Sequence, residues 1–467
     1  MYIDSHAHLF YPDFKEDIED VIRRAEDAGV AFFVVPATNV ETSKEAIALS
    51  ERHENIYVCV GIHPLDMNGA DDNSLQEIEK LSEHRKVVAI GEIGLDYYYD
   101  TTPREKQQRM FKAQIEIAIR RNLPIVVHTR DSMDDAVSMA AEMIQGNEYW
   151  RSQQATPNSR FPAPKGVFHC FSGDASTARK LLRMGFLVSY PGIVTFKNSS
   201  AAETLKAIGY DHIMLETDSP YLTPAPHRGK RNEPMYVPLI GKKVAEVCSA
   251  TEADVARTTT YNAKRLFNIG SLGEPVFTYS LGRSLYINLT IRCDADCVFC
   301  DRKGEAVVKG HNLKITREPT VQEIISGIKD PKSYDEVVFC GYGEPTIRFD
   351  AVKEIGSWVK ANGGKTRLNT DGHGSLINKR NIAPELKGVI DTVSISLNSV
   401  DPLQYGELMR INGEKNHAAM VDFAREAKKY VPEVVMSVVG IEEVDLEGAK
   451  KYVEDVLGVK YRVRPYF

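Results

Sequence analysis

The sequence predicts an α/β protein in which an N-terminal TIM-like (β/α)8 barrel is followed by a smaller, partial (β/α) barrel. Three observations lead to this prediction. Short apolar runs alternate with helical patterns in the first part of the chain, and their near-continuous apolar character suits parallel strands covered by helices. The alternation restarts after a Gly- and Pro-containing stretch. A chain of 467 residues is also long enough for two domains.

Eight apolar runs are expected to form the strands of the first barrel, because eight strand–helix units are what such a barrel needs. The runs span residues 2–9, 31–36, 56–61, 87–90, 125–127, 167–168, 186–189 and 213–215. Helical patterns lie between them, for example at residues 15–28, 40–53, 104–121 and 133–144.

Composition describes an ordinary soluble protein, with 43% hydrophobic and 26% charged residues. No apolar run is long enough to cross a bilayer, and the N-terminus lacks the pattern of a secretion signal, so we expect no membrane association. Three of the seven cysteines fall within eight residues and the other four are scattered. This is not a secreted disulfide framework, so the expected location is a reducing cytoplasm.

The charge distribution argues against non-specific nucleic-acid binding through a basic surface. From Val276 onward, 27 Lys and Arg residues balance 27 Asp and Glu residues, so the formal net charge of −7 belongs to the preceding part. A basic footprint of the kind that binds nucleic acid is therefore missing. Any phosphate substrate must be held by bound cations and a few local basic groups.

Metal-binding side chains stand at the ends of five of the eight runs. The first run contains His6 and His8, which point to the same side of an extended segment because side chains alternate along a strand. Catalytic groups in such barrels lie just past the carboxyl ends of the strands. A lone histidine at such a place is more often a hydrogen-bonded rim residue, but six ligands in these positions are improbable by chance. The set is His6, His8, Glu92, His128, His169 and Asp218.

Seven stretches of this region resemble the TatD family of metal-dependent hydrolases. They are residues 4–8 (Asp-Ser-His-Ala-His), 61–64 (Gly-Ile-His-Pro), 91–97 (Gly-Glu-Ile-Gly-Leu-Asp-Tyr), 169–173 (His-Cys-Phe-Ser-Gly), 216–222 (Glu-Thr-Asp-Ser-Pro-Tyr-Leu), 226–234 (Pro-His-Arg-Gly-Lys-Arg-Asn-Glu-Pro) and 261–267 (Tyr-Asn-Ala-Lys-Arg-Leu-Phe). The resemblance covers residues 1–268 and implies a two-metal barrel with deoxyribonuclease or related phosphodiesterase activity. A polar insertion at residues 145–164 departs from the family pattern and leaves the substrate open.

The resemblance also implies roles for individual residues around two divalent metal ions, which can be Zn, Mg or Mn. Glu92 would bridge the metals and Asp218 would in addition take a proton from the attacking water. His6, His8 and Asp218 would hold one metal, and His128 and His169 the other. We expect four further residues to contact phosphate or to support the ligands: His63, Asp96, Arg130 and Arg228. Tyr97 could stack on a base. The alternative for all five is ordinary packing at the rim or a salt bridge.

A linker at residues 269–275 is expected to separate the domains 1–268 and 276–467, because it has the Gly and Pro content of a linker. A predicted strand at residues 284–290 then leads into Cys293, Cys297 and Cys300. Structural zinc usually has four protein ligands, and no fourth partner stands at a suitable spacing. Three thiolates that leave one position open favour an iron–sulfur cluster that binds a substrate at its free iron.

This Cys-x3-Cys-x2-Cys loop resembles the radical S-adenosylmethionine superfamily, over residues 276–467. The resemblance implies a 4Fe-4S cluster, S-adenosylmethionine as cofactor, its reductive cleavage to a 5′-deoxyadenosyl radical, and a low-potential electron donor such as flavodoxin or ferredoxin. Further strands are predicted at residues 335–340, 393–398 and 434–440, and residues 368–372 are expected to end another strand. We expect contacts to S-adenosylmethionine from Gly341, Gly343, Glu344, Asn369, Ser394 and Ser396.

The sequence therefore predicts a bifunctional fusion that resembles a TatD-linked radical S-adenosylmethionine protein, with a nucleic-acid or other phosphodiester substrate for its hydrolase. Two alternatives stay open. The barrel could hydrolyse a non-DNA ester or amide, or it could serve as a substrate-binding module for the radical domain. Metal-dependent release of nucleotides from DNA distinguishes the hydrolase from the binding module.

Overall fold

The computed structural model describes residues 1–99, 101–146 and 164–465. The described residues divide into two compact units, one ending at Leu272 and the other starting at Gly273. This division lies within the stretch expected to be a linker. Most of the insertion at residues 145–164 lies outside the described residues. No described helix has the length and apolarity that a membrane span requires.

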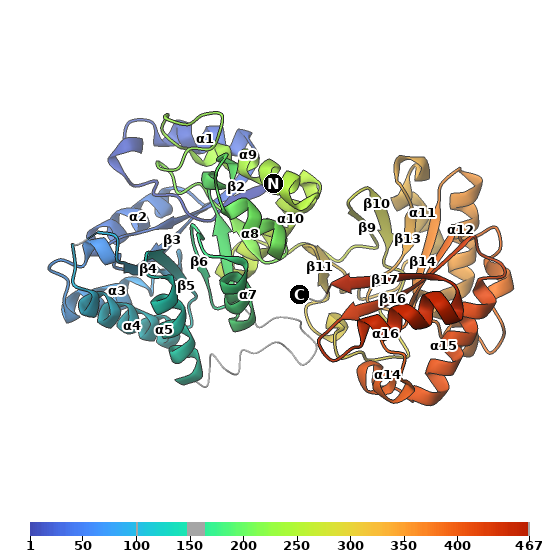
Figure 1. Cartoon of the computed structure of the whole chain (residues 1–467). Helices are drawn as coiled ribbons and strands as arrows, with labels where there is room; N and C mark the ends of the chain where they lie inside the picture. The colour runs from blue at the N-terminus through green and yellow to red at the C-terminus, as the bar shows by residue number, and fades with distance from the viewer. Residues whose placement is uncertain (100, 147–163, 466–467) are drawn as a thin grey trace. The chain divides into compact units, whose positions relative to one another are not determined.

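The first unit is a parallel eight-stranded barrel in which the strands follow one another in chain order (Figure 1). Its strands are β1 (Tyr2–Asp4), β2 (Val30–Pro36), β3 (Ile56–Val60), β4 (Val87–Asp96), β5 (Ile125–Arg130), β6 (Gly166–Phe168), β7 (Phe186–Tyr190) and β8 (Ile213–Leu215). The barrel is completed between its last and first strands: the amide of Ser5 donates to the carbonyl of Leu215 at 3.1 Å, and Ala7 bridges Ser219 in parallel. The (β/α)8 prediction is confirmed.

Helices surround the barrel and one closes its amino-terminal end. They are α1 (Ile18–Asp27), α2 (Val40–Arg52), α3 (Asp72–Leu81), α4 (Arg104–Arg121), α5 (Met133–Gly146), α7 (Ala175–Met184), α8 (Ala201–Ile208), α9 (Val237–Cys248) and α10 (Glu252–Phe267). Inside the barrel, Val34, Val126 and Met214 belong to one buried cluster with Leu266 and Phe267 of α10. Polar side chains gather at the carboxyl ends of the strands, and this apolar layer packs beneath them.

Three strands differ from the prediction in ways that matter for the ligands. β1 ends at Asp4, so His6 and His8 lie in the segment after it. This segment lies between β2 and the chain after β8: the amide of Ala7 donates to the carbonyl of Val34 at 3.1 Å, and the amide of His8 donates to the carbonyl of Ser219 at 2.9 Å. β5 continues to Arg130, so His128 lies within it. β4 continues to Asp96, with a register shift toward β5, so Glu92 lies within this strand.

The second unit is built on a seven-stranded sheet in the order β17-β16-β15-β14-β13-β10-β9 (Figure 1). Its strands are β9 (Thr278–Leu281), β10 (Ser284–Ile287), β13 (Val337–Phe339), β14 (Thr366–Thr370), β15 (Thr392–Ser396), β16 (Glu433–Gly440) and β17 (Lys460–Pro465). All neighbours are parallel except β9 and β10. The sequence analysis did not predict β9 and β17.

Helices cover one face of this sheet. They are α11 (Val321–Ile328), α12 (Phe349–Ala361), α13 (Gly374–Ile377), α14 (Pro402–Met409), α15 (Gly413–Ala427) and α16 (Leu446–Lys451), and a short hairpin, β11 (Val307–Val308) and β12 (His311–Asn312), follows the cysteine loop. Leu368, Val393 and Met436 of the sheet pack in one buried core with Phe349 and Phe423 of the helices.

Candidate active sites

A buried carboxylate lies at the centre of the first site. Glu92 is 3% exposed, and its two oxygens face two different sets of histidines. Oε2 lies 3.3 Å from Nε2 of His6 and 3.7 Å from Nε2 of His8. Oε1 lies 3.0 Å from Nδ1 of His128 and 2.8 Å from Nε2 of His169. A carboxylate in this position is able to bridge two cations.

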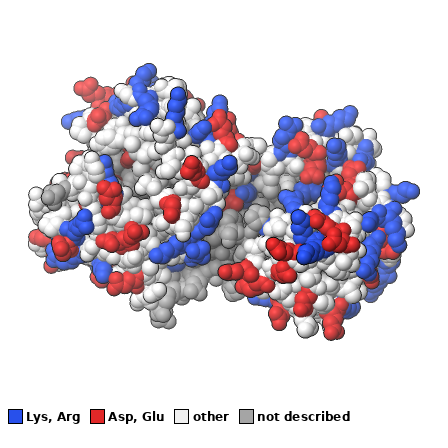
Figure 2. All heavy atoms as spheres, viewed as in Figure 1, with Lys and Arg blue, Asp and Glu red and all other residues white. Residues whose placement is uncertain are grey.

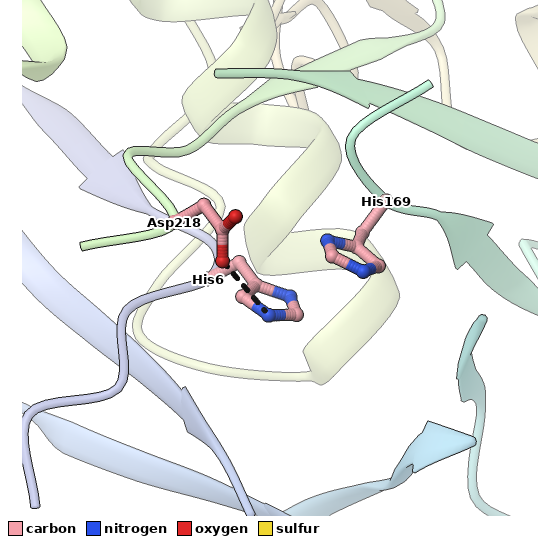
Figure 3. Close-up of side chains that lie close together, drawn as sticks. All are labelled: His6, His169 and Asp218. Carbon is pink, nitrogen blue, oxygen red and sulfur yellow. Dashed lines mark ion pairs between the residues drawn. The ribbon is translucent and has the colours of Figure 1, made fainter. Parts of the chain in front are cut away.

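Asp218 joins the first of these sets. Its Oδ1 lies 3.8 Å from Nε2 of His6 (Figure 3). The same oxygen lies 3.5 Å from Nε2 of His8. The His6 ring stacks on the His169 ring, with centroids 3.9 Å apart, so the two histidine sets are in direct contact. The structure therefore brings all six expected ligands to one place.

Hydrogen bonds outside the centre decide which ring nitrogen each histidine presents to it. Nδ1 of His8 lies 3.1 Å from the carbonyl of Pro36, which leaves Nε2 for the centre. Nε2 of His128 lies 3.2 Å from Oδ2 of Asp96, which leaves Nδ1. Carboxylates and carbonyls of this kind orient metal-binding histidines in proteins. Asp96, predicted as a supporting residue, therefore lies where it can hold His128.

His63 differs from the other histidines. Its Nδ1 accepts a hydrogen bond from the amide of Leu65 at 3.1 Å, so in the neutral ring the proton is on Nε2. This nitrogen lies 3.5 Å from Oε1 of Glu92 and faces it as a donor. Burial lowers the pKa of His63 to about 3, so the ring is neutral at physiological pH. The geometry favours a hydrogen-bond donor at this position over a metal ligand.

The electrostatics of the metal-free centre favour an ionised carboxylate. Burial opposes ionisation of Glu92, but His169, His63 and His6 outweigh it and hold its pKa well below the ordinary value. Burial also lowers the pKa of His6. Although burial lowers the pKa of the His169 and His128 rings as well, Glu92 and Glu216 raise the pKa of His169 well above its ordinary value, and Asp96 and Glu92 raise that of His128. Neutral imidazole and ionised carboxylate are the forms that bind metal ions.

The donor set fits two divalent ions. Nδ1 of His6 is buried and has no hydrogen-bond partner among the described residues. Three sets of side chains have ligand atoms close enough to share an ion: His6, His8 and Glu92; His6, His169 and Asp218; and His63, Glu92 and His128. Imidazole and carboxylate suit zinc, and carboxylate also suits magnesium and manganese.

A cavity of about 780 Å³ opens above this centre. The expected contacts His63, Asp96 and Arg130 line it, together with Tyr11, Tyr99 and Tyr221, which the sequence analysis did not identify. The Arg130 guanidinium lies over the ring of Tyr98 at 4.0 Å and over that of Tyr99 at 4.8 Å. One wall of the cavity thus offers aromatic rings and a cation next to the metal-binding side chains.

Tyr97 and Arg228 do not line this cavity. The Tyr97 hydroxyl is 2.8 Å from Oδ2 of Asp135, and the Arg104 guanidinium covers its ring at 4.2 Å. The Arg228 guanidinium lies over the ring of Phe196 at 3.8 Å. Both side chains are therefore held by other residues outside the cavity, whereas Tyr11, Tyr99 and Tyr221 line it.

Glu216 was missed by the sequence analysis. Its Oε1 accepts a hydrogen bond from the amide of Cys170 at 2.6 Å, and its Oε2 accepts one from the Ser189 hydroxyl at 2.6 Å. Oε1 also lies 3.8 Å from Nδ1 of His169. This buried carboxylate fixes the segment that carries His169. A signal was present in the sequence, because Glu216 follows a predicted strand directly.

The three cysteines of the second site lie in one loop that follows β10, and each is partly buried. Burial raises the pKa of Cys293 and raises that of Cys297 to about 12, so neither thiol is ionised before a metal binds. Three cysteines in one loop fit an iron–sulfur cluster with an open iron.

Helix α14 holds this loop from one side. The amides of Asp296 and Val298 donate to the carbonyls of Met409 and Leu408 at 3.0 and 2.9 Å. Sδ of Met409 lies 3.4 Å from Sγ of Cys297.

A buried histidine holds the other end of the loop. Nδ1 of His373 lies 2.7 Å from Oδ2 of Asp294, and Nε2 lies 2.9 Å from the hydroxyl of Tyr405, which is also on α14. The loop is therefore fixed on both sides of Cys297 before any cluster binds.

The residues expected to contact S-adenosylmethionine fall in different environments. A Cβ at Gly341 would lie 2.4 Å from Oδ1 of Asn288, and one at Gly343 would lie 2.3 Å from the carbonyl of Thr290, so both glycines allow their loop to pack against the chain that leads to Cys293. The Glu344 carboxylate is used within the protein: it accepts hydrogen bonds from the Thr346 and Thr370 hydroxyls and from the Asp371 amide.

The other three lie on one face of the sheet. Oδ1 of Asn369 accepts a hydrogen bond from Arg367 at 3.3 Å, and Oγ of Ser396 accepts one from Arg464 at 3.2 Å. Ser394 lines a hollow near the amino ends of the strands. The cysteine loop follows the carboxyl end of β10, whereas Ser394 is the middle residue of β15, two positions before Ser396 at the carboxyl end of that strand.

Comparisons with known proteins agree with these two sites. The profile of TatD related DNases matches residues 3–268, and that of the radical SAM superfamily matches residues 287–456. The uncharacterized metal-dependent hydrolase YabD of Bacillus subtilis is 41% identical over 270 residues, which cover 58% of this chain and 100% of that protein. The uncharacterized metal-dependent hydrolase YcfH of Escherichia coli is 35% identical over 271 residues, with 57% and 96% covered. The crystal structure of the E. coli TatD homolog YjjV covers 58% of this chain and 98% of its own, at 29% identity and a TM-score of 0.52.

Proposed function

Because this chain belongs to the TatD related DNase family and carries a radical SAM superfamily domain after its hydrolase barrel, we propose that it combines two reactions. The barrel is a two-metal phosphodiesterase that acts on nucleic acid, as a deoxyribonuclease. The second domain is a 4Fe-4S enzyme that reductively cleaves S-adenosylmethionine. Both act in the cytoplasm, and the second needs a low-potential electron donor such as flavodoxin or ferredoxin.

The observation that carries the hydrolase proposal is that the two oxygens of Glu92 face separate histidine sets. His6, His8 and Asp218 would hold one divalent ion, and His128 and His169 the other. Two ions held this way lower the pKa of a water and neutralise phosphate oxygens during displacement. Asp218 lies at the edge of the cavity and accepts the proton of the attacking water.

The cavity residues orient a phosphodiester. His63 presents an Nε2–H donor, and Arg130 supplies a guanidinium, the side chain best suited to bind phosphate in a bidentate way. The exposed rings of Tyr99 and Tyr221 offer stacking surfaces for a base. Basic and acidic side chains are interspersed on the face shown in Figure 2, without a continuous basic surface, so binding depends on the metal site and these local groups.

In the second domain, Cys293, Cys297 and Cys300 would hold the cluster, which supplies an electron for cleavage of S-adenosylmethionine when it is bound. Asp294 and Asp296 keep the loop in place through His373 and the carbonyl of Met409. The glycine loop 341–343 lies against the same loop, since the Glu344 amide donates to the carbonyl of Arg292 at 2.9 Å.

Two assays test the proposal. Protein depleted of metal and reloaded with Mg, Mn or Zn should release nucleotides from end-labelled single-stranded DNA, and His128→Ala should not. Anaerobic protein with a reconstituted cluster should convert S-adenosylmethionine to 5′-deoxyadenosine and methionine when dithionite is added. If no metal restores DNA hydrolysis while an aryl ester or amide is cleaved, the hydrolase belongs to the alternative substrate class.

A further inference from the structure

The sheet of the second unit has one apolar and one polar face. Side chains alternate along each strand, so residues on either side of a core residue point to the opposite face. Leu368 and Val393 pack in the core under the helices, whereas their neighbours Arg367 and Ser394 face the other way, as does Arg462 of β17. No described helix contributes a side chain to the hollow on this second face.

A hollow of about 450 Å³ lies on the polar face near the amino ends of β14 to β17. Its lining includes Arg367, Thr392, Ser394, Glu433, Lys460 and Arg462. Arg367 is only 9% exposed, and its Nε has no hydrogen-bond partner in the described part of the chain. Its other nitrogens contact the Tyr286 hydroxyl, Asn369 and Glu336. A buried guanidinium with an unsatisfied N–H marks a place where an acceptor is missing.

The charges around the hollow leave a positive excess. Glu336 pairs with Arg367 at 2.8 Å, and Glu433 pairs with Lys460 at 3.1 Å. Arg462 has no ion-pair partner within residues 1–99, 101–146 and 164–465. The hydroxyls of Thr392 and Ser394 add two groups that can donate hydrogen bonds.

We propose that this hollow binds an anionic oxygen group, a phosphate or a carboxylate, on the substrate of the radical domain. That the anion belongs to a substrate rests on the function proposed above for this domain, whereas the anion site itself does not depend on that function. Guanidinium groups bind both anions through paired N–H donors, and Arg462 with the Nε of Arg367 supplies such donors.

The position of the hollow suits an anchoring role. The same face continues from Ser394 to Ser396 at the carboxyl end of β15, a step of roughly 7 Å at about 3.3 Å per residue. Asn398 follows two residues later, and its Nδ2 lies 3.1 Å from Sδ of Met409, which contacts Cys297. An elongated substrate held by its anionic end reaches the side of the sheet where the cluster loop lies.

Residue-specific arginine modification tests the proposal on the full-length protein without S-adenosylmethionine. Phenylglyoxal reacts with accessible guanidinium groups, and mass spectrometry of peptides gives the rate at each arginine. The probes are inorganic phosphate and succinate at constant ionic strength set with sodium chloride. Arg425, an exposed residue of α15 that pairs with Asp422, serves as the internal control.

One of the two anions should slow modification of Arg462 about fivefold or more while Arg425 changes little. Protection by phosphate alone assigns a phosphorylated substrate, and protection by succinate alone assigns a carboxylate. Ser394→Ala, which changes no charge, should weaken the protection. If neither anion protects Arg462, or if Ser394→Ala and Arg367→Gln are both protected as well as the parent protein, the hollow is not an anion site. The modification assay does not depend on cleavage of S-adenosylmethionine. A protein that fails to cleave S-adenosylmethionine therefore counts against the proposed function and not against the anion site.

Discussion

Replacement of Glu92 by glutamine should separate metal binding from folding. The change removes one negative charge and keeps the shape of the side chain. Glu92 lies 2.8 to 3.7 Å from the ligand nitrogens, so its charge would act at close range on an ion that these ligands hold. At about 3 Å and an effective dielectric constant of about 20, Coulomb's law gives roughly 5 kcal/mol per unit charge, or more than about 10³-fold in affinity.

The metal-free variant should be less stable than the parent protein but remain folded. Burial opposes the Glu92 charge, but attraction to the histidines outweighs it, so loss of the charge lowers the free energy of unfolding. Metal titration followed by elemental analysis should give two ions per chain for the parent and fewer than two for Glu92→Gln, with DNA hydrolysis lowered by about 10³-fold or more. Glu142→Gln changes an exposed surface carboxylate of the same barrel and should bind two ions. Two ions still bound tightly by folded Glu92→Gln would refute the bridging role.

Three further changes test one supporting residue in each site and one ion pair of the first unit. Asp96→Asn should weaken metal affinity by about 10- to 100-fold, because the carboxylate fixes Nε2 of His128; isothermal titration with zinc measures this, and unchanged affinity would contradict it. His373→Phe keeps an aromatic ring but loses the bond to Asp294, which holds the cysteine loop. When a chelator is added, the cluster absorbance should decay at least about tenfold faster than in the parent protein. An equal decay rate would contradict this role. Asp17→Asn should lower the free energy of unfolding by about 1 kcal/mol at neutral pH, because Asp17 bonds Arg231 and Arg24. The Arg231 bond holds the pKa of Asp17 at about 2. The difference in the free energy of unfolding between the parent and Asp17→Asn should therefore persist in mild acid and vanish as the pH falls through about 2. A difference that stays the same below a pH of about 2 would rule out the ion pair.

The strand-end rule for barrels was sufficient to identify the metal-binding side chains. His169 follows β6 directly, and His128 lies in the last part of β5. Parallel strands of a barrel bring such positions together whatever their separation in the chain. The rule failed for details that depend on local backbone geometry. The register shift in β4 places Glu92 within the strand, and a period of two residues does not reveal such a shift.

Side-chain partners from distant segments were not predictable from spacing. The guanidinium of Arg231, which lies in one of the family motifs, is paired with Asp17 and Glu233. The pairing with Asp17 joins residues 214 positions apart, which a motif cannot show.

The support of the cysteine loop was hidden for the same reason. Met409 lies 112 positions after Cys297, in a helix whose sequence carries no metal-binding signal. Ser394 lies in the middle of β15 and lines the hollow, a place that only the strand boundaries reveal.

The central claim is that the chain carries two separate catalytic centres, and one measurement tests it most directly. DNA hydrolysis and dithionite-driven cleavage of S-adenosylmethionine are both measured anaerobically on purified Cys297→Ser and His128→Ala. Cys297→Ser should lose the cluster absorbance and cleavage of S-adenosylmethionine while hydrolysis stays within a few-fold, and His128→Ala should show the reverse. Loss of hydrolysis in a folded Cys297→Ser protein would contradict the account, because the two halves would then form one composite site.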